Sequence, residues 1–297
     1  LDLDRRPNYG FEVTGPEQFK RQAIAVLLWG QTIFGEPFAK IDYANGLTFT
    51  LGGDANLLPI VDEAGNAIRK WDIKRAFTYV AYAEDQLGGR FTDDSVRYLA
   101  LVLAIQAERI HAGHIADEID DELLSWLQTL NLWPIAADVA RYLGRQVGRN
   151  WAGSEIALIA MYLLTAPRNE RWPDDLEIDD SFSGLIDELL QTIVEAYNLP
   201  ALAHDRTLRD GLVTHIVPAC LRHRFDIWAP QDLFEAELSQ KYSFEWELAS
   251  ILTKIVEQEM GVILPESESN NIALMLRAAY IRERPNLLQE VIVICPS

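Results

Sequence analysis

The stretch GLVTHIVPACLRHRF, residues 211–225, places a nucleophile and a cation in an apolar segment with helical periodicity. Arg222 follows His215 by seven residues, which on a helix is within about 20° of two full turns and roughly 10 Å along the axis. The two side chains therefore share a face. A neutral imidazole is a nucleophile near neutral pH, and a guanidinium could bind an anion attached to it.

The residues of this stretch also fit a purely structural histidine. Pro218 lacks an N–H group and so frees the carbonyl of Thr214, which could satisfy a ring nitrogen of a core histidine. From these residues alone, both interpretations of His215 stay open.

A second candidate is HAGHIADEIDDE, residues 111–122, in which His111, His114 and Asp117 follow one another at three-residue spacing. Such spacing suits a metal ion. Gly113 is a typical helix terminator, so a loop and the acidic start of the next helix explain the run more simply. We expect no metal and no cofactor. The chain also lacks the P-loop, dinucleotide, nucleophile-elbow and zinc-protease motifs, which argues against an enzyme.

Composition limits the partners of the chain. Twenty-six Lys and Arg against 45 Asp and Glu give a net charge of −19, which repels the phosphates of DNA and RNA. The two cysteines, Cys220 and Cys295, form no disulfide framework, and we find neither a signal peptide nor a membrane-spanning apolar run. These features predict a cytoplasmic protein that does not bind nucleic acid by itself.

The chain contains an internal duplication at an offset of 113 residues. The offset pairs Leu99 with Leu212, Arg109 with Arg222, Trp133 with Trp246, Gly148 with Gly261, and Glu155 with Glu268. It predicts two copies of one helical domain with a core tryptophan in each. His215 has Val102 as its counterpart. Because the arginine recurs where no histidine is present, we expect a structural role for at least Arg109, such as capping a helix or pairing with Glu155.

Periodicity predicts a helix over residues 17–34 and mostly helix over 71–167 and 182–284. Residues 43–70 are rich in turn residues and predict a small hairpin or an irregular connection. The segment between the two helical regions, residues 167–181, has two prolines and many acids and is the best linker candidate.

The order of these motifs resembles the phosphotransferase-system regulation domain (PRD), which occurs in tandem in bacterial regulators of sugar operons. The family motif L-x-x-H followed seven residues later by Arg matches LVTHIVPACLR, and its later Pro-Glu-x-Glu segment matches GVILPESESNNIALMLRAAYIRER. Met275 stands at the second histidine position, while Val102 and Tyr162 stand at the two positions in the first copy. The resemblance implies phosphorylation of His215, with Arg222 near the phosphate, and a first copy that retains only packing or dimerisation.

The flanks extend the resemblance. Residues 1–69 are similar to the connection after the missing helix-turn-helix domain of mannitol-activator regulators, and residues 288–297 to the start of an enzyme IIB-like domain, with Cys295 at its phosphorylated cysteine. The resemblance implies an all-α fold of two five-helix PRDs, at 70–168 and 182–287, joined by a linker at 169–181.

The implied function is the regulatory core of a bacterial transcriptional activator of a sugar-utilisation operon. Its implied partners are the carrier HPr or a sugar-specific enzyme IIB subunit, a second copy of the chain, and DNA only through the missing N-terminal domain. Two alternatives stay open: a phosphorylation-independent interaction module, and the regulatory region of an RNA-binding antiterminator.

Overall fold

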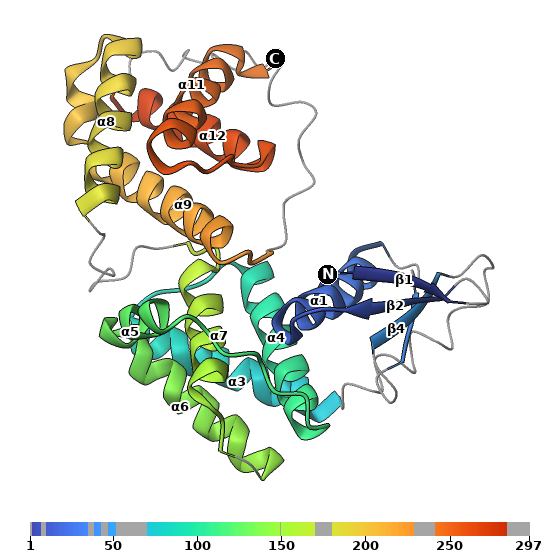
Figure 1. Ribbon diagram of the computed structural model, residues 1–297. Helices are drawn as coiled ribbons and strands as arrows, with labels where there is room; N and C mark the ends of the chain where they lie inside the picture. The colour runs from blue at the N-terminus through green and yellow to red at the C-terminus, as the bar shows by residue number, and fades with distance from the viewer. Residues whose placement is uncertain are drawn as a thin grey trace, which may run out of the picture. The chain divides into compact units, whose positions relative to one another are not determined.

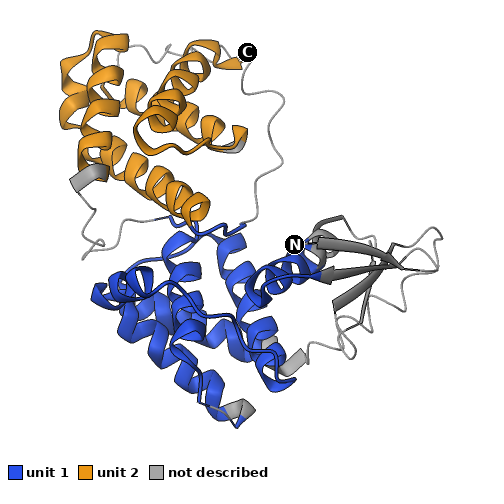
Figure 2. Ribbon diagram, viewed as in Figure 1, with its two compact units in different colours: residues 1–176, 225–230 blue, residues 177–224, 231–297 orange. Residues whose placement is uncertain are grey.

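The computed structural model describes residues 2–6, 10–34, 39–42, 47–51, 70–148, 150–169, 180–228 and 241–283. The chain forms two compact units, coloured separately in Figure 2. The first comprises Leu1–Leu176 and Phe225–Pro230, and the second Glu177–Arg224 and Gln231–Ser297. Each unit holds one copy of the duplicated helical domain.

The first unit begins with a small antiparallel sheet and a helix (Figure 1). The sheet order is β1-β2-β4-β3, and its strands are β1 (Asp2–Arg6), β2 (Gly10–Thr14), β3 (Ala39–Asp42) and β4 (Leu47–Leu51). Helix α1 (Glu17–Phe34) lies between β2 and β3 in the chain and has the bounds predicted from its periodicity. The strands β1 and β2 were not predicted, although the alternation Leu-Asp-Leu-Asp at the start of the chain is a strand signal.

Five helices form the first copy: α3 (Lys70–Leu87), α4 (Asp93–His111), α5 (Asp121–Thr129), α6 (Leu132–Val147) and α7 (Gly153–Thr165). Helix α4 starts where the Thr92 hydroxyl accepts a hydrogen bond from the Ser95 N–H at 3.2 Å. It ends just before Gly113, whose φ of +94° confirms that this glycine terminates the helix.

The second copy contains α8 (Asp180–Tyr197), the 3-10 helix η1 (Pro200–His204), α9 (Arg206–Arg224), α11 (Ser243–Met260) and α12 (Glu266–Glu283). Helices α9 and α12 begin 113 residues after α4 and α7, so the offset read from the sequence recurs in the structure. The counterpart of α5 falls mostly outside the described residues. The prediction of two all-α bundles is confirmed; the sheet belongs to the segment before them.

The central helices α4 and α9 each bury most of their residues because neighbouring helices pack around them. Leu99, Leu103 and Ile159 lie in the core of the first copy, and Leu212 and Ile272 in that of the second. The duplicated tryptophans, Trp133 and Trp246, were predicted to pack in the core and are each partly buried rather than fully buried. Trp246 Nε1 donates a hydrogen bond to Asn270 Oδ1 on α12 at 3.2 Å.

The predicted domain limits remain a prediction, and several predicted features fall on residues that are not described. These are most of the linker at 169–181 and all of the segment 288–297, including Cys295.

Two matched glycines end equivalent helices in the left-handed conformation. Gly148 follows α6 with φ +69°, and Gly261 follows α11 with φ +66°. We expect Gly261→Ala to lower the free energy of unfolding by about 1 kcal/mol, because a Cβ is strained there although nothing crowds it. Gly184→Ala in α8 is the matched control, since that helical position is also uncrowded and alanine should stabilise it by up to about 1 kcal/mol. Urea unfolding that gave both changes the same sign would contradict this assignment.

Candidate functional site

The second copy brings together the histidine and arginine that drew attention in the sequence. Both side chains reach one carboxylate, Glu268 in the first turn of α12. Arg222 Nη2 donates a hydrogen bond to Glu268 Oε1 at 2.7 Å, and His215 Nδ1 lies 3.6 Å from Glu268 Oε2. The seven-residue spacing on α9 therefore places His215 and Arg222 on either side of a single acid, which sequence reasoning about this stretch did not name.

Burial and nearby charges set the ionisation of Glu268 and Arg222. The Glu268 side chain is 10% exposed, while that of His215 is 32% exposed and can be reached from solvent. Burial acts to raise the pKa of Glu268, but the nearby His215 and the charge of Arg222 outweigh it, and the pKa is lowered. Burial lowers the pKa of Arg222 from a high ordinary value, so both groups are charged at neutral pH.

The position of Glu268 distinguishes the two ring nitrogens of His215. With Glu268 facing Nδ1, the proton of a neutral ring is favoured on that nitrogen, and Nε2 keeps its lone pair. Nε2 has no hydrogen-bond partner within the described ranges. By contrast, Cys220 on the same helix is buried, and burial raises the pKa of its thiol to about 12. It is therefore a thiol rather than a nucleophilic thiolate.

The position of the second expected histidine is filled by packing. Met275 on α12 lies against α9 at Gly211, where a Cβ would come within 2.7 Å of the Met275 sulfur. Only glycine permits this approach without a shift of the thioether. The structure thus places Met275 in an interhelical contact near the start of α9.

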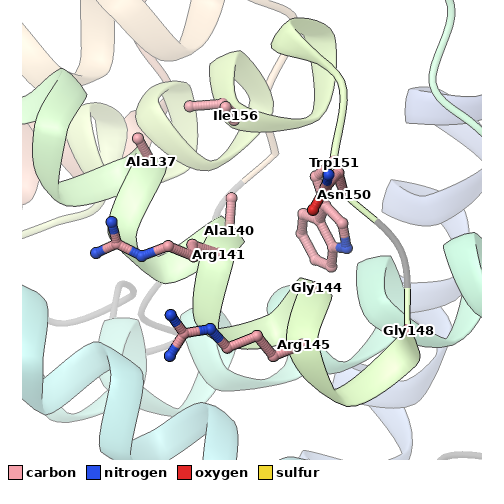
Figure 3. A pocket seen from close by; sticks show the side chains of 9 residues that line it. All are labelled: Ala137, Ala140, Arg141, Gly144, Arg145, Gly148, Asn150, Trp151 and Ile156. Carbon is pink, nitrogen blue, oxygen red and sulfur yellow. The ribbon is translucent and has the colours of Figure 1, made fainter.

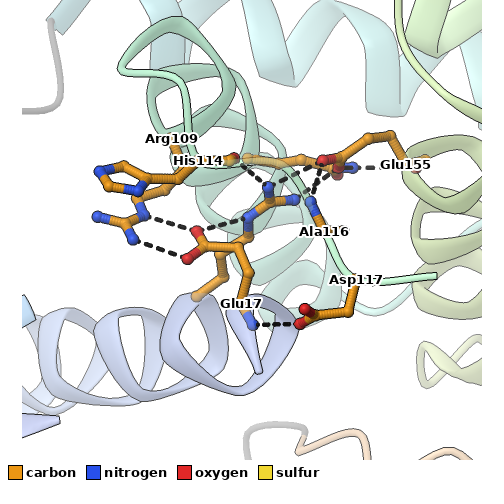
Figure 4. Close-up of polar contacts among 8 residues, drawn as sticks. Glu17, Arg109, His114, Ala116, Asp117 and Glu155 are labelled. Atoms are coloured by element: carbon orange, nitrogen blue, oxygen red, sulfur yellow. Dashed lines mark hydrogen bonds and ion pairs between the residues drawn. The ribbon is translucent and has the colours of Figure 1, made fainter. Parts of the chain in front are cut away.

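In the first copy the equivalent arginine and glutamate have other partners, which α1 supplies (Figure 4). Arg109 donates two hydrogen bonds to the carboxylate of Glu17, from Nε and Nη2, each at 2.7 Å. Arg21, one turn further along α1, donates to Glu155 from Nη1 at 2.6 Å and from Nη2 at 2.9 Å. Arg109 is buried in an ion pair, as a structural role requires, but its partner is Glu17 and not Glu155.

The loop after α4 completes this cluster. Asp117 accepts a hydrogen bond from the Glu17 N–H at 2.8 Å, and the carbonyl of His114 accepts one from Arg21 at 2.8 Å. The Asp117 carboxylate thus caps the first turn of α1. Among the described residues there is no group of three His, Cys, Asp or Glu side chains arranged for a metal ion. The segment 111–117 serves here to hold α1.

The two positions that the resemblance equates with histidines in the first copy are inside the protein. Val102 is 4% exposed and Tyr162 is 5% exposed. Burial raises the pKa of the Tyr162 phenol well above its ordinary value. Neither side chain offers a group that could take a phosphoryl group from a partner protein.

The ion pair of Glu17 predicts a specific dependence of stability on pH. Burial acts to raise the pKa of Glu17, but Arg109 and then Arg21 outweigh it, so the folded-state pKa lies below its ordinary value of 4.5. This stabilisation is therefore present above about pH 4.5 and is lost as the pH falls through the lower folded pKa. In urea unfolding, the free energy of unfolding of wild type should exceed that of Glu17→Gln by an amount that is constant near pH 6 and shrinks towards pH 3. A difference that grew on acidification would contradict the sign.

The first copy also has an open cavity of about 550 Å³ (Figure 3). Arg141 and Arg145 extend from α6 on one side of it, and Trp151 and Asn150 lie on the other. Arg141 is paired with Asp138. The cavity lies away from the Arg109 cluster and shares no residue with it.

The sequence matches a known family over most of its helical part. The model of the PRD domain matches residues 78–166 and again 187–279. The chain is also 23% identical over 299 residues to the "Probable licABCH operon regulator" of Bacillus subtilis (strain 168). That alignment covers 99% of this chain but 43% of the relative, so the chain spans less than half the length of that protein. No helix in the described ranges has the length and apolar content needed to cross a bilayer.

Proposed function

Since the chain belongs to the PRD domain family, we propose that it is the regulatory part of a transcriptional regulator controlled by the phosphotransferase system, with His215 as the phosphoryl acceptor. The observation that carries this proposal is the geometry of the second copy. A partly exposed imidazole has its Nδ1 facing Glu268, and Arg222 is bound to the same carboxylate.

The proposed reaction is a transfer between two proteins. The Nε2 lone pair of His215 attacks the phosphorus of a phosphorylated donor, a new N–P bond forms, and the bond to the donor breaks, so that the donor leaves with the electron pair. Glu268 holds the Nδ1 proton and stabilises the positive charge that develops on the ring. The proposed donors are HPr or a sugar-specific enzyme IIB subunit, which would place the chain in the cytoplasm.

The proposed structural response to phosphorylation of His215 follows from the charges of Glu268 and Arg222. A phosphoryl group on Nε2 adds close to two negative charges on the side of the imidazole ring away from Glu268. The new anion repels that carboxylate through the ring and attracts Arg222, since a guanidinium binds phosphate as well as carboxylate. The contact that joins α9 to α12 therefore changes when His215 is modified. DNA binding through a domain absent from this chain and assembly as a homodimer complete the proposal.

The relative named as an operon regulator supports control of transcription. We propose an activator rather than an antiterminator from the resemblance of the flanks, in which Cys295 would be a second acceptor. The proposal gives the chain no catalytic activity of its own and no cofactor.

Phosphoryl transfer tests the proposal. The chain is incubated with phosphoenolpyruvate, enzyme I and HPr, with and without an enzyme IIB subunit, and acid-labile label is counted. We expect labelling of wild type and of His223→Ala, a matched exposed histidine on the same helix, and loss of label in His215→Ala. Equal labelling of His215→Ala and wild type would overturn the assignment.

A second function is favoured by a different observation. Val102, Tyr162 and Met275 replace three expected histidines, which suits an interaction module that works without phosphorylation. That function predicts no label on wild type when another PRD regulator is labelled in the same mixture.

A further inference from the structure

Helix α1 supplies the first copy with a helix that has no counterpart among the described residues of the second copy. The duplicated bundles run from α3 and α8, whereas α1 precedes α3 and packs on α4. Its first turn reaches the C-terminal end of α4, and Trp29 meets Tyr98 edge to face, with ring centroids 5.8 Å apart, near the start of α4. Helix α1 therefore covers the face of α4 that corresponds to the face of α9 on which His215 and Arg222 lie.

The carboxylate of Glu17 makes the contact with Arg109 that an anion would make. It receives two parallel hydrogen bonds at 2.7 Å, and the side chains of Arg109 and Glu17 are 3% and 8% exposed. This fork geometry serves carboxylate and phosphate alike. Arg109 Nη1 is also buried and has no hydrogen-bond partner within the described ranges. The carboxylate thus leaves the N–H groups of Nη1 unused.

The same helix fixes two further parts of the first unit. Arg21 pairs with Glu155, and the Gln22 side chain donates to the carbonyl of Asp226 and accepts from the Trp228 N–H, both at 2.9 Å. Trp228 lies on Tyr98, with ring centroids 5.2 Å apart. A change at Glu17 therefore affects the contacts that α1 makes with the loop after α4 and with the segment 226–228.

We propose that Arg109 forms an anion-binding site whose resident anion is Glu17. Helix α1 thereby occupies the arginine site of the first copy, whereas the equivalent arginine of the second copy, Arg222, lies on the same helix face as His215. The first copy is then held in one arrangement by its own carboxylate and needs no phosphoryl donor. The comparison with His215 rests on the proposed function, but the anion site itself does not.

Chemical rescue tests this site without any phosphoryl transfer. Glu17→Ala removes the resident anion and leaves Arg109 buried and uncompensated, which should lower the midpoint of thermal unfolding of the first unit by about 10 °C. Formate, which replaces the carboxylate, and inorganic phosphate, which can also reach Nη1, should restore part of this loss at millimolar concentration. Chloride at equal ionic strength is the control. We expect phosphate to restore more than formate.

Two further variants keep the test decisive. Glu17→Gln preserves the shape of the side chain and serves if Glu17→Ala does not fold, and it should show a smaller rescue because the amide partly fills the site. In Glu17→Ala/Arg109→Met the site has no cation, so neither anion should rescue it. Equal effects of phosphate on wild type, Glu17→Ala and the double variant would overturn the proposal, as would equal effects of chloride and phosphate. Absence of label on His215 in the transfer assay would leave this result unaffected.

Discussion

Replacing Glu155 by alanine should destabilise the first unit by about 3–5 kcal/mol. The carboxylate is 1% exposed and accepts hydrogen bonds from four donors. Two come from Arg21, one from Gln106 Nε2 at 2.7 Å and one from the Ala116 N–H at 2.8 Å. Its loss leaves the buried Arg21 with Glu17 as its remaining carboxylate partner, which Arg109 already shares. The Ala116 N–H and one N–H of Gln106 Nε2 also lose their acceptor, and each unpaired buried donor carries its own penalty.

Calorimetry measures this effect as a fall of about 10 °C in the unfolding midpoint. The matched control is Arg97→Ala on α4, which removes an ion pair with Asp94 whose side chains are 64% and 50% exposed. An exposed pair contributes less than about 1 kcal/mol, so this variant should unfold close to wild type. Equal shifts for Glu155→Ala and Arg97→Ala would show that the buried cluster does not stabilise the fold.

Replacing Glu268 by glutamine should slow phosphoryl transfer to His215 by about 10²-fold, although the acceptor histidine remains. The amide has the same shape but no charge, so it neither favours the required proton position nor stabilises the imidazolium that forms during attack. Glu268 acts through His215 and is a positioning residue. A change confined to packing would lower stability and leave the transfer rate of the folded fraction unchanged.

The rate is measured under single-turnover conditions with excess phosphorylated donor, and circular dichroism establishes that each variant is folded. Glu266→Gln is the matched control, because Glu266 is an exposed acid in the same turn of α12. We expect this control to transfer at the wild-type rate. Transfer to Glu268→Gln at that same rate would contradict the role of Glu268.

Much of the fold could be predicted because its sequence signals are either local or repeated in the two copies. Periodicity gives α1 its bounds, and the glycines that end α4, α6 and α11 are visible in the sequence. The 113-residue offset predicted two similar bundles, and it recurs in the starts of α9 and α12. A spacing of seven residues sufficed to place His215 and Arg222 together, because both lie on one helix.

The contacts of the first copy were not predicted, because they join residues far apart in the sequence. Arg109 and Glu17 are separated by 92 residues, and Arg21 and Glu155 by 134. The duplication suggested that Arg109 would reach Glu155, as Arg222 reaches Glu268. Helix α1 precedes the first of the two similar bundles, so the comparison of the copies could not reveal that its residues pair with both Arg109 and Glu155. The one available signal was the four-residue spacing of Glu17 and Arg21 at the start of the predicted helix.

The location of the phosphate is the most direct test of the central claim that His215 is the acceptor. After transfer from the donor proteins, the chain is digested with trypsin at alkaline pH, which preserves phosphohistidine, and the peptides are identified by mass spectrometry. The tryptic peptide of residues 210–222 contains His215 as its only histidine, while His223 falls in the next peptide. We predict one phosphoryl group on the 210–222 peptide, on the histidine. Phosphate found on other peptides and absent from this one would contradict the claim.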